Sequence, residues 1–159
     1  MTMNIRSAGP DDLDLIIGFI QALAAYERLA DAVVLERAIL HDHLFGAKPM
    51  AEVVIGEVND VACGFALFFH NFSTFEGRPG IYLEDLFVDP QARGAGLGKA
   101  LLAWLAKLAI ERGCARLEWS VLDWNEPAIN FYASLGATAM NDWTINRVDG
   151  EALTALAQA

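Results

Sequence analysis

Hydrophobic residues follow two different spacings along the chain, and each spacing predicts one kind of element. From Leu13 to about Leu29, and again over residues 97–109, apolar residues recur at helical spacing, which predicts two amphipathic helices. Shorter helices are expected at Leu35–Phe45 and Ala128–Leu135. Runs rich in β-branched and aromatic residues predict strands at Met3–Ala8, Ala51–Val58, Val61–Phe69, Ile81–Val88, Arg116–Leu122, Thr138–Met140 and Trp143–Val148.

The order of these elements, with no linker or repeat between them, predicts one α/β domain over residues 1–159. Asn59 and Asp60 join two of the strands and are a two-residue hairpin signal. Hydrophobic residues make up 55% of the chain, so it can build a core without cross-links. Cys63 and Cys114 form no CxxC pair, which favours a reduced, cytoplasmic protein.

The net charge of −10 indicates which kinds of molecule the chain can bind. An acidic chain lacks the broad basic surface that nucleic acids require, whereas it suits a small cationic substrate. No apolar run reaches the roughly 18 residues that cross a bilayer, and residues 1–9 hold no signal-like segment, so no membrane partner is expected. His41 and His43 would face different sides of a helix, so no metal site is expected.

The most informative local feature is the segment Arg93–Lys99, which has glycine at positions 94, 96 and 98 between a strand and a long helix. It is not a P-loop, because residue 93 is not glycine and residue 100 is Ala rather than Ser or Thr. It is not a dinucleotide fingerprint either, since that motif needs glycine at position 99. Open backbone at a helix start favours a diphosphate, and the plainer alternative is a tight turn in which glycine only permits packing.

The pattern Arg-x-x-Gly-x-Gly at residues 93–98 resembles the acetyl-CoA pyrophosphate loop of the GNAT N-acetyltransferases. Segments that look like the diamine (spermidine/spermine-type) branch of that family are Leu23–Glu27, Phe45–Pro49, Tyr82–Val88 and Trp124–Tyr132. The resemblance implies the α/β GNAT fold, with a mixed central sheet of about six or seven strands flanked by helices. It also implies a V-shaped opening between two parallel central strands, which end near Val88 and Leu122.

By the same resemblance, the chain is expected to be an enzyme that transfers acetyl from its co-substrate acetyl-CoA directly to a primary amine of a small cation. The amine would belong to a diamine, a polyamine or a lysine-like molecule. Residues 72–78 lack the Asp-Pro-Trp segment of the polyamine enzymes and look more like the thialysine branch. Two alternatives are an enzyme that acetylates protein lysines or N-termini, and a non-catalytic acyl-CoA-binding module. Relatives are typically homodimers, so a homodimer is expected, with the apolar stretch Ala152–Ala157 as a candidate for its interface.

Roles for single residues also follow from the resemblance. Acetyl-CoA would contact Leu86, Phe87, Val88, Arg93, Gly94, Ala95, Gly96, Leu97, Gly98, Lys99, Asn125, Pro127 and Ala128. The amine would be held by Tyr26, Glu27, Glu84, Asp85 and Asp142. Glu84 is the expected base that removes the ammonium proton, directly or through a water, and Tyr132 is the expected acid that protonates the leaving thiolate. This direct attack requires no metal and no nucleophilic cysteine or serine.

Each of these roles has a plainer alternative. Because side chains alternate along a strand, Glu84 and Asp85 are expected on opposite faces, and Glu84 would then be an ordinary solvent-facing carboxylate. Tyr132 would be a packed helix aromatic. Tyr26 and Glu27 would form a helix end with no substrate role.

Overall fold

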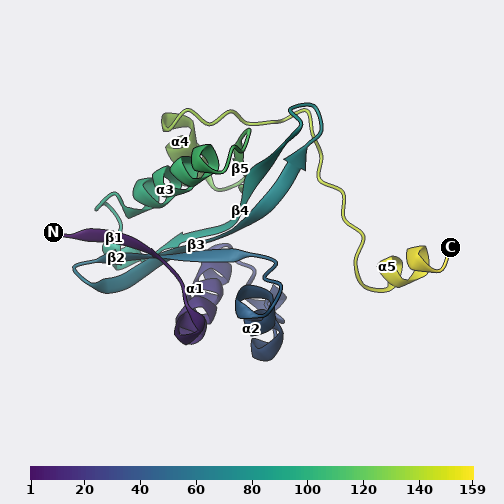
Figure 1. The fold of residues 1–159 in the computed structure, drawn as a ribbon, viewed down its shortest axis with the longest axis horizontal. Coiled ribbons are helices and arrows are strands. Elements are labelled where there is room, and N and C mark those ends of the chain that lie inside the picture. The colour runs from purple at the N-terminus through teal and green to yellow at the C-terminus, as the bar shows by residue number, and fades with distance from the viewer. The chain divides into compact units, whose positions relative to one another are not determined.

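The computed structural model describes residues 1–159, which form two compact units, 1–122 and 123–159. The first unit contains a five-stranded sheet whose strands lie in chain order (Figure 1). They are β1 (Met3–Ser7), β2 (Glu52–Val58), β3 (Val61–Ser73), β4 (Arg78–Val88) and β5 (Leu117–Trp119). Neighbouring strands are antiparallel except β4 and β5, which are parallel, so the sheet is mixed as predicted.

Helices cover both faces of this sheet. The helices α1 (Leu13–Tyr26) and α2 (Arg37–Phe45) lie on one face, and α3 (Leu97–Glu111) lies on the other (Figure 1). Short 3₁₀ turns occur at Pro10–Asp12, Ala30–Ala32 and Pro90–Ala92. These helices confirm the helical spacing predicted for the first unit. No helix of the structure has both the length and the hydropathy to span a bilayer.

Aromatic side chains fill the core on both sides of the sheet. Between α1 and the sheet, the ring of Phe19 of α1 lies 5.4 Å from that of Phe65 and 6.0 Å from that of Phe87. On the face below α3, the rings of Phe68 and Trp104 are 6.4 Å apart. Because Phe65 and Phe68 belong to the same strand, β3 contributes core residues to both faces of the sheet. This packing fixes the position of its neighbour β4.

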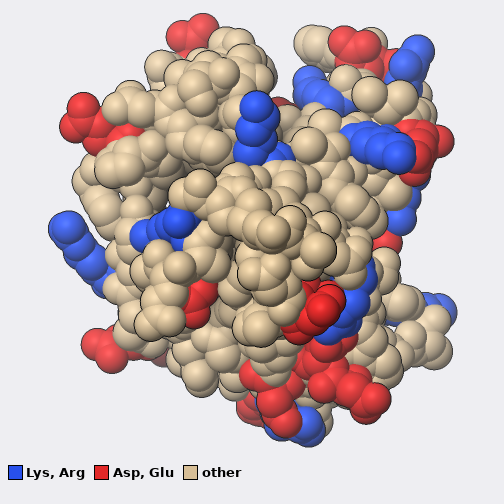
Figure 2. All heavy atoms as spheres, turned by 90° about the vertical axis from the view of Figure 1, so that its left-hand side faces the viewer, with Lys and Arg blue, Asp and Glu red and all other residues tan.

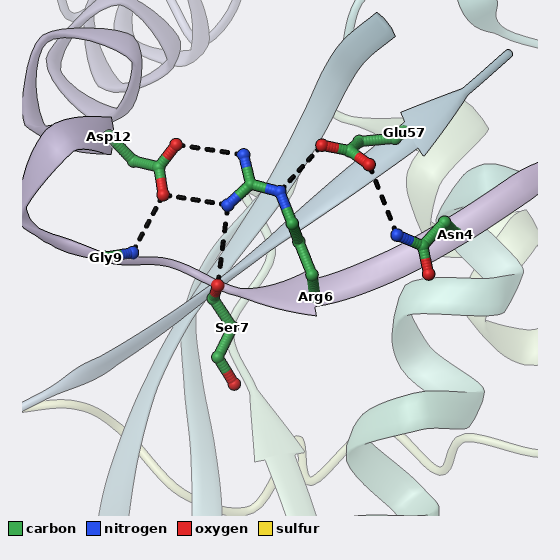
Figure 3. Close-up of polar contacts among 6 residues, drawn as sticks. All are labelled: Asn4, Arg6, Ser7, Gly9, Asp12 and Glu57. Atoms are coloured by element: carbon green, nitrogen blue, oxygen red, sulfur yellow. Dashed lines mark hydrogen bonds and ion pairs between the residues drawn. The ribbon is translucent and has the colours of Figure 1, made fainter. Parts of the chain in front are cut away.

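The start of the chain is held by one arginine (Figure 3). From β1, Arg6 donates two hydrogen bonds to the carboxylate of Asp12, at 2.8 and 2.9 Å, and its Nε donates to Glu57 of β2 at 2.7 Å. The same Asp12 carboxylate accepts a hydrogen bond from the backbone N–H of Gly9 at 2.8 Å. These bonds connect the first strand, its neighbour in the sheet and the turn that leads into α1.

The pairing of β4 with its two neighbours changes at one residue. Leu67 of β3 pairs with Asp85, whereas the next residue, Phe68, pairs with Leu83, so Glu84 is an extra residue that forms a β-bulge. On its other side, β4 pairs with β5 only from Ile81 to Leu83. The two parallel strands therefore separate directly before Glu84, as the resemblance implies, although β5 is an edge strand and not a central one.

The second unit contains α4 (Glu126–Ser134) and α5 (Gly150–Ala157) and no strand. The strands expected at Thr138–Met140 and Trp143–Val148 are therefore wrong. The alternation of apolar residues over 143–148 is genuine, but a strand also needs a hydrogen-bonded neighbour, and here Trp143 is 79% exposed outside any ladder.

The sheet accordingly has five strands instead of six or seven, and β5 lies at its edge instead of its centre. The strand expected at Arg116–Leu122 is shortened to Leu117–Trp119. The segment Ala152–Ala157, expected as an apolar stretch and a candidate interface, forms most of α5.

Candidate active site

The glycine-rich segment forms an open turn at the start of α3. Asp89 closes the preceding turn by accepting a hydrogen bond from the backbone N–H of Gln91 at 2.9 Å. Gly94 and Gly96 have φ angles of +87° and +88°, which residues with a Cβ rarely adopt. A Cβ added to either residue would meet no atom within 4 Å, so the backbone surface of the turn is open to a ligand.

The helix that follows presents unpaired donors to this surface. Gly96 is the N-cap of α3, and the first regular helical bond runs from the N–H of Ala100 to the carbonyl of Gly96 at 3.0 Å. The N–H groups of Leu97, Gly98 and Lys99 therefore have no partner within the helix, and the helix dipole makes them a favourable site for negative charge. The turn therefore offers free donors to an anion, and the resemblance assigns the diphosphate of acetyl-CoA to this position.

Two glycines in the sheet hold this turn in place, and sequence reasoning missed both. A Cβ on Gly56 would lie 2.8 Å from Cδ1 of Leu97, and a Cβ on Gly64 would lie 3.1 Å from Cδ2 of the same side chain. Leu97, the fully buried first residue of α3, therefore packs directly onto the backbone of β2 and β3. Glycine inside a strand is the sequence signal that indicates such a close approach.

Three carboxylates lie close together where β4 and β5 separate. Glu84 is the exposed bulge residue, Asp85 follows it, and Glu27 is the C-cap of α1. Asp85 is half-buried, and its burial, followed by repulsion from Glu84 and Glu27, raises its pKa to about 6. Burial and the charge of Glu84 also raise the pKa of Glu27. None of the three forms an ion pair.

Tyr26, the residue before Glu27, contacts Arg93 of the glycine segment. The guanidinium of Arg93 lies 5.2 Å from the centre of the Tyr26 ring, a cation–π contact, and its Nε donates to the carbonyl of Val88 at 3.2 Å. Arg28, directly after Glu27, has a left-handed backbone with φ of +63°, which turns the chain at the end of α1. The first unit therefore brings both ends of the predicted site together.

The backbone of Leu86, Phe87 and Val88 runs along the opening. These residues pair with β3 on one side, but β5 pairs with none of them on the other. The side of β4 that faces the opening therefore takes part in no β-ladder, which is where the resemblance places the pantetheine arm. A separate cavity of about 170 Å³ is lined by Trp104, Lys107, Leu108 and Glu111 and contains no predicted site residue.

The remaining predicted residues belong to the second unit. Asn125 is the N-cap of α4, and its side-chain oxygen accepts a hydrogen bond from the N–H of Ala128 at 3.4 Å, with Pro127 in the first turn. Tyr132 lies on α4, with its ring 5.6 Å from that of Phe131. Asp142 lies in an exposed turn. The roles of these residues stay predictions.

Comparison with known proteins identifies the chain's family. The model of the Acetyltransferase (GNAT) family matches residues 20–137, which include the glycine turn, the carboxylates and α4. The chain belongs to the GNAT acetyltransferase family. A solved integron cassette protein from the mobile metagenome of V. cholerae is similar over 100% of this chain and 99% of its own, at 30% identity and a TM-score of 0.82.

Relatives of this GNAT acetyltransferase carry names that specify an amine. The thialysine N-epsilon-acetyltransferase of Bos taurus is 35% identical, over 96% of each chain. The L-ornithine N5-acetyltransferase NATA1 of Arabidopsis thaliana is 31% identical, over 98% of this chain and 88% of its own. The protein is thus an N-acetyltransferase with the predicted α/β GNAT fold, and enzymes of this family use acetyl-CoA as co-substrate.

Proposed function

We propose that this enzyme acetylates a primary amine of a small cationic molecule, of the lysine-like or diamine class. The observation that carries the proposal is the group of Glu27, Glu84 and Asp85, whose carboxylates repel one another and form no ion pair. An ammonium group bound among them would offset that repulsion. The named activities of the relatives, which act on thialysine and ornithine, support the same class of substrate.

The reaction requires an amine without its proton. An alkyl ammonium has a pKa near 10.4, so the amine arrives charged at neutral pH and a carboxylate must take one proton before nitrogen can attack. Family resemblance assigns this role to Glu84. Acetyl-CoA supplies an acetyl group activated as a thioester, and Tyr132 gives its phenol proton to the departing sulfur.

The other predicted residues bind and orient the two substrates. Amide groups at the start of α3 and the cation of Arg93 would hold the diphosphate, with Asn125, Pro127 and Ala128 along the rest of the coenzyme. A backbone N–H of β4 near Leu86 would polarise the acetyl carbonyl. Tyr26 and Asp142 would contact the far end of the amine.

A panel of acceptors tests this proposal. Release of free CoA thiol is measured with thialysine, lysine, ornithine, short diamines, spermidine, a lysine-containing peptide and neutral or anionic amines. The small cations should give the highest kcat/KM. Preference for neutral or anionic acceptors would contradict the proposal, faster turnover of the peptide would favour a protein acetyltransferase, and acetyl-CoA binding without any turnover would favour a non-catalytic module.

We also propose that the enzyme works as a homodimer in a reducing compartment such as the cytoplasm. Both cysteines, Cys63 and Cys114, are free thiols, which supports the compartment. Exposed apolar residues of the second unit, which include Met140, Ile145 and Leu156, support an interface. Sedimentation equilibrium should give twice the chain mass, and the mass of a single chain would contradict the dimer.

A further inference from the structure

The β-bulge brings Asp85 to the α1 face of the sheet. With strict alternation, Asp85 would lie on the α3 face together with Leu83. The extra residue Glu84 shifts the register, so Asp85 pairs with Leu67 and precedes Phe87 by two positions. Leu67 and Phe87 both belong to the core cluster below α1, so Asp85 shares their face of the sheet. Asp85 therefore projects to the apolar α1 face, whereas Glu84 stays exposed.

The surroundings of Asp85 favour a group that takes up a proton. Its side chain accepts no hydrogen bond and forms no ion pair, and the charged groups that face it are Glu84 on its own strand and Glu27 at the end of α1. The negative end of the α1 dipole, which Glu27 caps, acts in the same direction. Protonation of Asp85 relieves all of these repulsions, and the resulting pKa of about 6 is close to that of an effective base at neutral pH.

We propose that Asp85, rather than its exposed neighbour Glu84, accepts the proton that the substrate ammonium loses before attack. The inference rests on the proposed function. One N–H proton passes from the ammonium to a carboxylate oxygen of Asp85, and the freed nitrogen pair forms the C–N bond as the C–S bond breaks. The nitrogen's second proton leaves with the thiolate through Tyr132, and Asp85 returns its own proton to solvent. Glu84 and Glu27 hold the cation.

Substitution at the two adjacent carboxylates gives opposite expectations for the pH profile. In the wild type, kcat/KM for a diamine should rise to a plateau above about pH 6.5, because ionised Asp85 accepts the charged amine. Asp85→Asn should lower kcat by about 10²- to 10⁴-fold, the usual contribution of a general base. It should also replace the plateau with a rise of about tenfold per pH unit up to pH 8, because only the scarce neutral amine then reacts.

Glu84→Gln should keep the plateau. Removing this like charge lowers the pKa of Asp85, so the rise of kcat/KM that precedes the plateau should move to lower pH. The KM for the amine should increase by less than about fivefold. Glu111→Gln, an exposed carboxylate on α3, serves as the control for charge alone and should leave the profile unchanged. Unchanged acetyl-CoA affinity and circular dichroism would show that each variant is folded.

The outcomes separate this inference from the function on which it rests. If the wild type turns over no small amine, the proposed function fails. If the wild type is active but Glu84→Gln abolishes the plateau and Asp85→Asn only shifts it, Glu84 is the base and the inference alone fails. The inference would also fail if Asp85→Asn lowered kcat equally at every pH and left the rise to the plateau unchanged.

Discussion

Glu84 is the only residue of β4 without a partner on β3, and this single position changes what its neighbours face. The sequence predicts that Glu84 and Asp85 lie near the substrate amine, and the structure places them beside Glu27. The expectation that alternation alone decides their faces is wrong for Asp85. A bulge adds no distinctive residue to the sequence, so its effect on register cannot be seen in the pattern of a single strand.

Tyr132 is the predicted acid, and one atom tests its role. Tyr132→Phe removes only the phenolic oxygen, so kcat should fall by roughly 10²-fold or more while the Kd of acetyl-CoA stays within about twofold. Stopped-flow turnover and calorimetry measure the two quantities. Tyr82→Phe is the matched control, because that hydroxyl bonds Ser120 at 2.7 Å and has no assigned role in the reaction. Unchanged kcat in Tyr132→Phe would remove it from the acid role.

Among the elements, those defined by a local sequence pattern are predicted correctly, whereas strands that depend on a distant partner are predicted poorly. The hairpin at Asn59 and Asp60 is confirmed, with both residues at positive φ as a tight two-residue turn requires. The helices of the first unit are confirmed because the apolar stripe of each is contained in its own sequence. The strand over residues 143–148 is wrong because strand formation depends on a partner far away in the chain.

The contact of α3 with the sheet yields a prediction for the coenzyme turn. Gly64→Ala places a Cβ 2.8 Å from the Phe87 carbonyl and 3.1 Å from Leu97, so strand and helix must move apart. The free energy of unfolding should fall by about 1–3 kcal/mol, and acetyl-CoA should bind more weakly because Leu97 joins the glycine turn to α3. Thermal unfolding and calorimetry measure the two effects.

Gly18→Ala is the control for this experiment. Gly18 lies inside α1 with no atom near an added Cβ, so the same substitution there should stabilise the protein by about 0.5–1 kcal/mol without affecting acetyl-CoA. Equal behaviour of the two variants would mean that the contact between Leu97 and Gly64 does not position the turn.

For the whole molecule, the excess of acidic side chains determines how stability depends on pH. The net charge is −10, and Figure 2 shows the largest group of acidic side chains in the lower part of that view, with some Lys and Arg side chains among them. Such a chain repels itself at neutral pH, and lowering the pH reduces that repulsion. The shifted carboxylates add local contributions of both signs.

Stability should therefore pass through a maximum at mildly acidic pH. The pKa of Asp85 in the fold, about 6, lies above its unfolded value, so the folded state binds the proton more tightly and gains stability as pH falls from 7 toward 4. Arg6 lowers the pKa of Asp12, and Arg112 lowers that of Glu52, so these pairs lose their contribution as pH falls below about 4.

Calorimetric scans from pH 8 to pH 3 measure this balance. The Tm should rise from pH 7.5 to about pH 5, by about 2–4 °C for each kcal/mol regained, and then drop below pH 4. Asp85→Asn should have a higher Tm at pH 7.5 and a flatter rise. A Tm that declines steadily from neutral pH would show that the carboxylate group costs the fold no stability.

The parting of β4 from β5 leaves the strand edge from Glu84 to Val88 outside any ladder. Unpaired edges of this kind recruit strands from other molecules, which is a common route to aggregation. The proposed function assigns this edge to the acetyl donor, and the edge begins with two adjacent carboxylates. Like charges there discourage a strand of another chain from pairing with this edge, so the acidic residues proposed to bind the amine also protect the edge from aggregation.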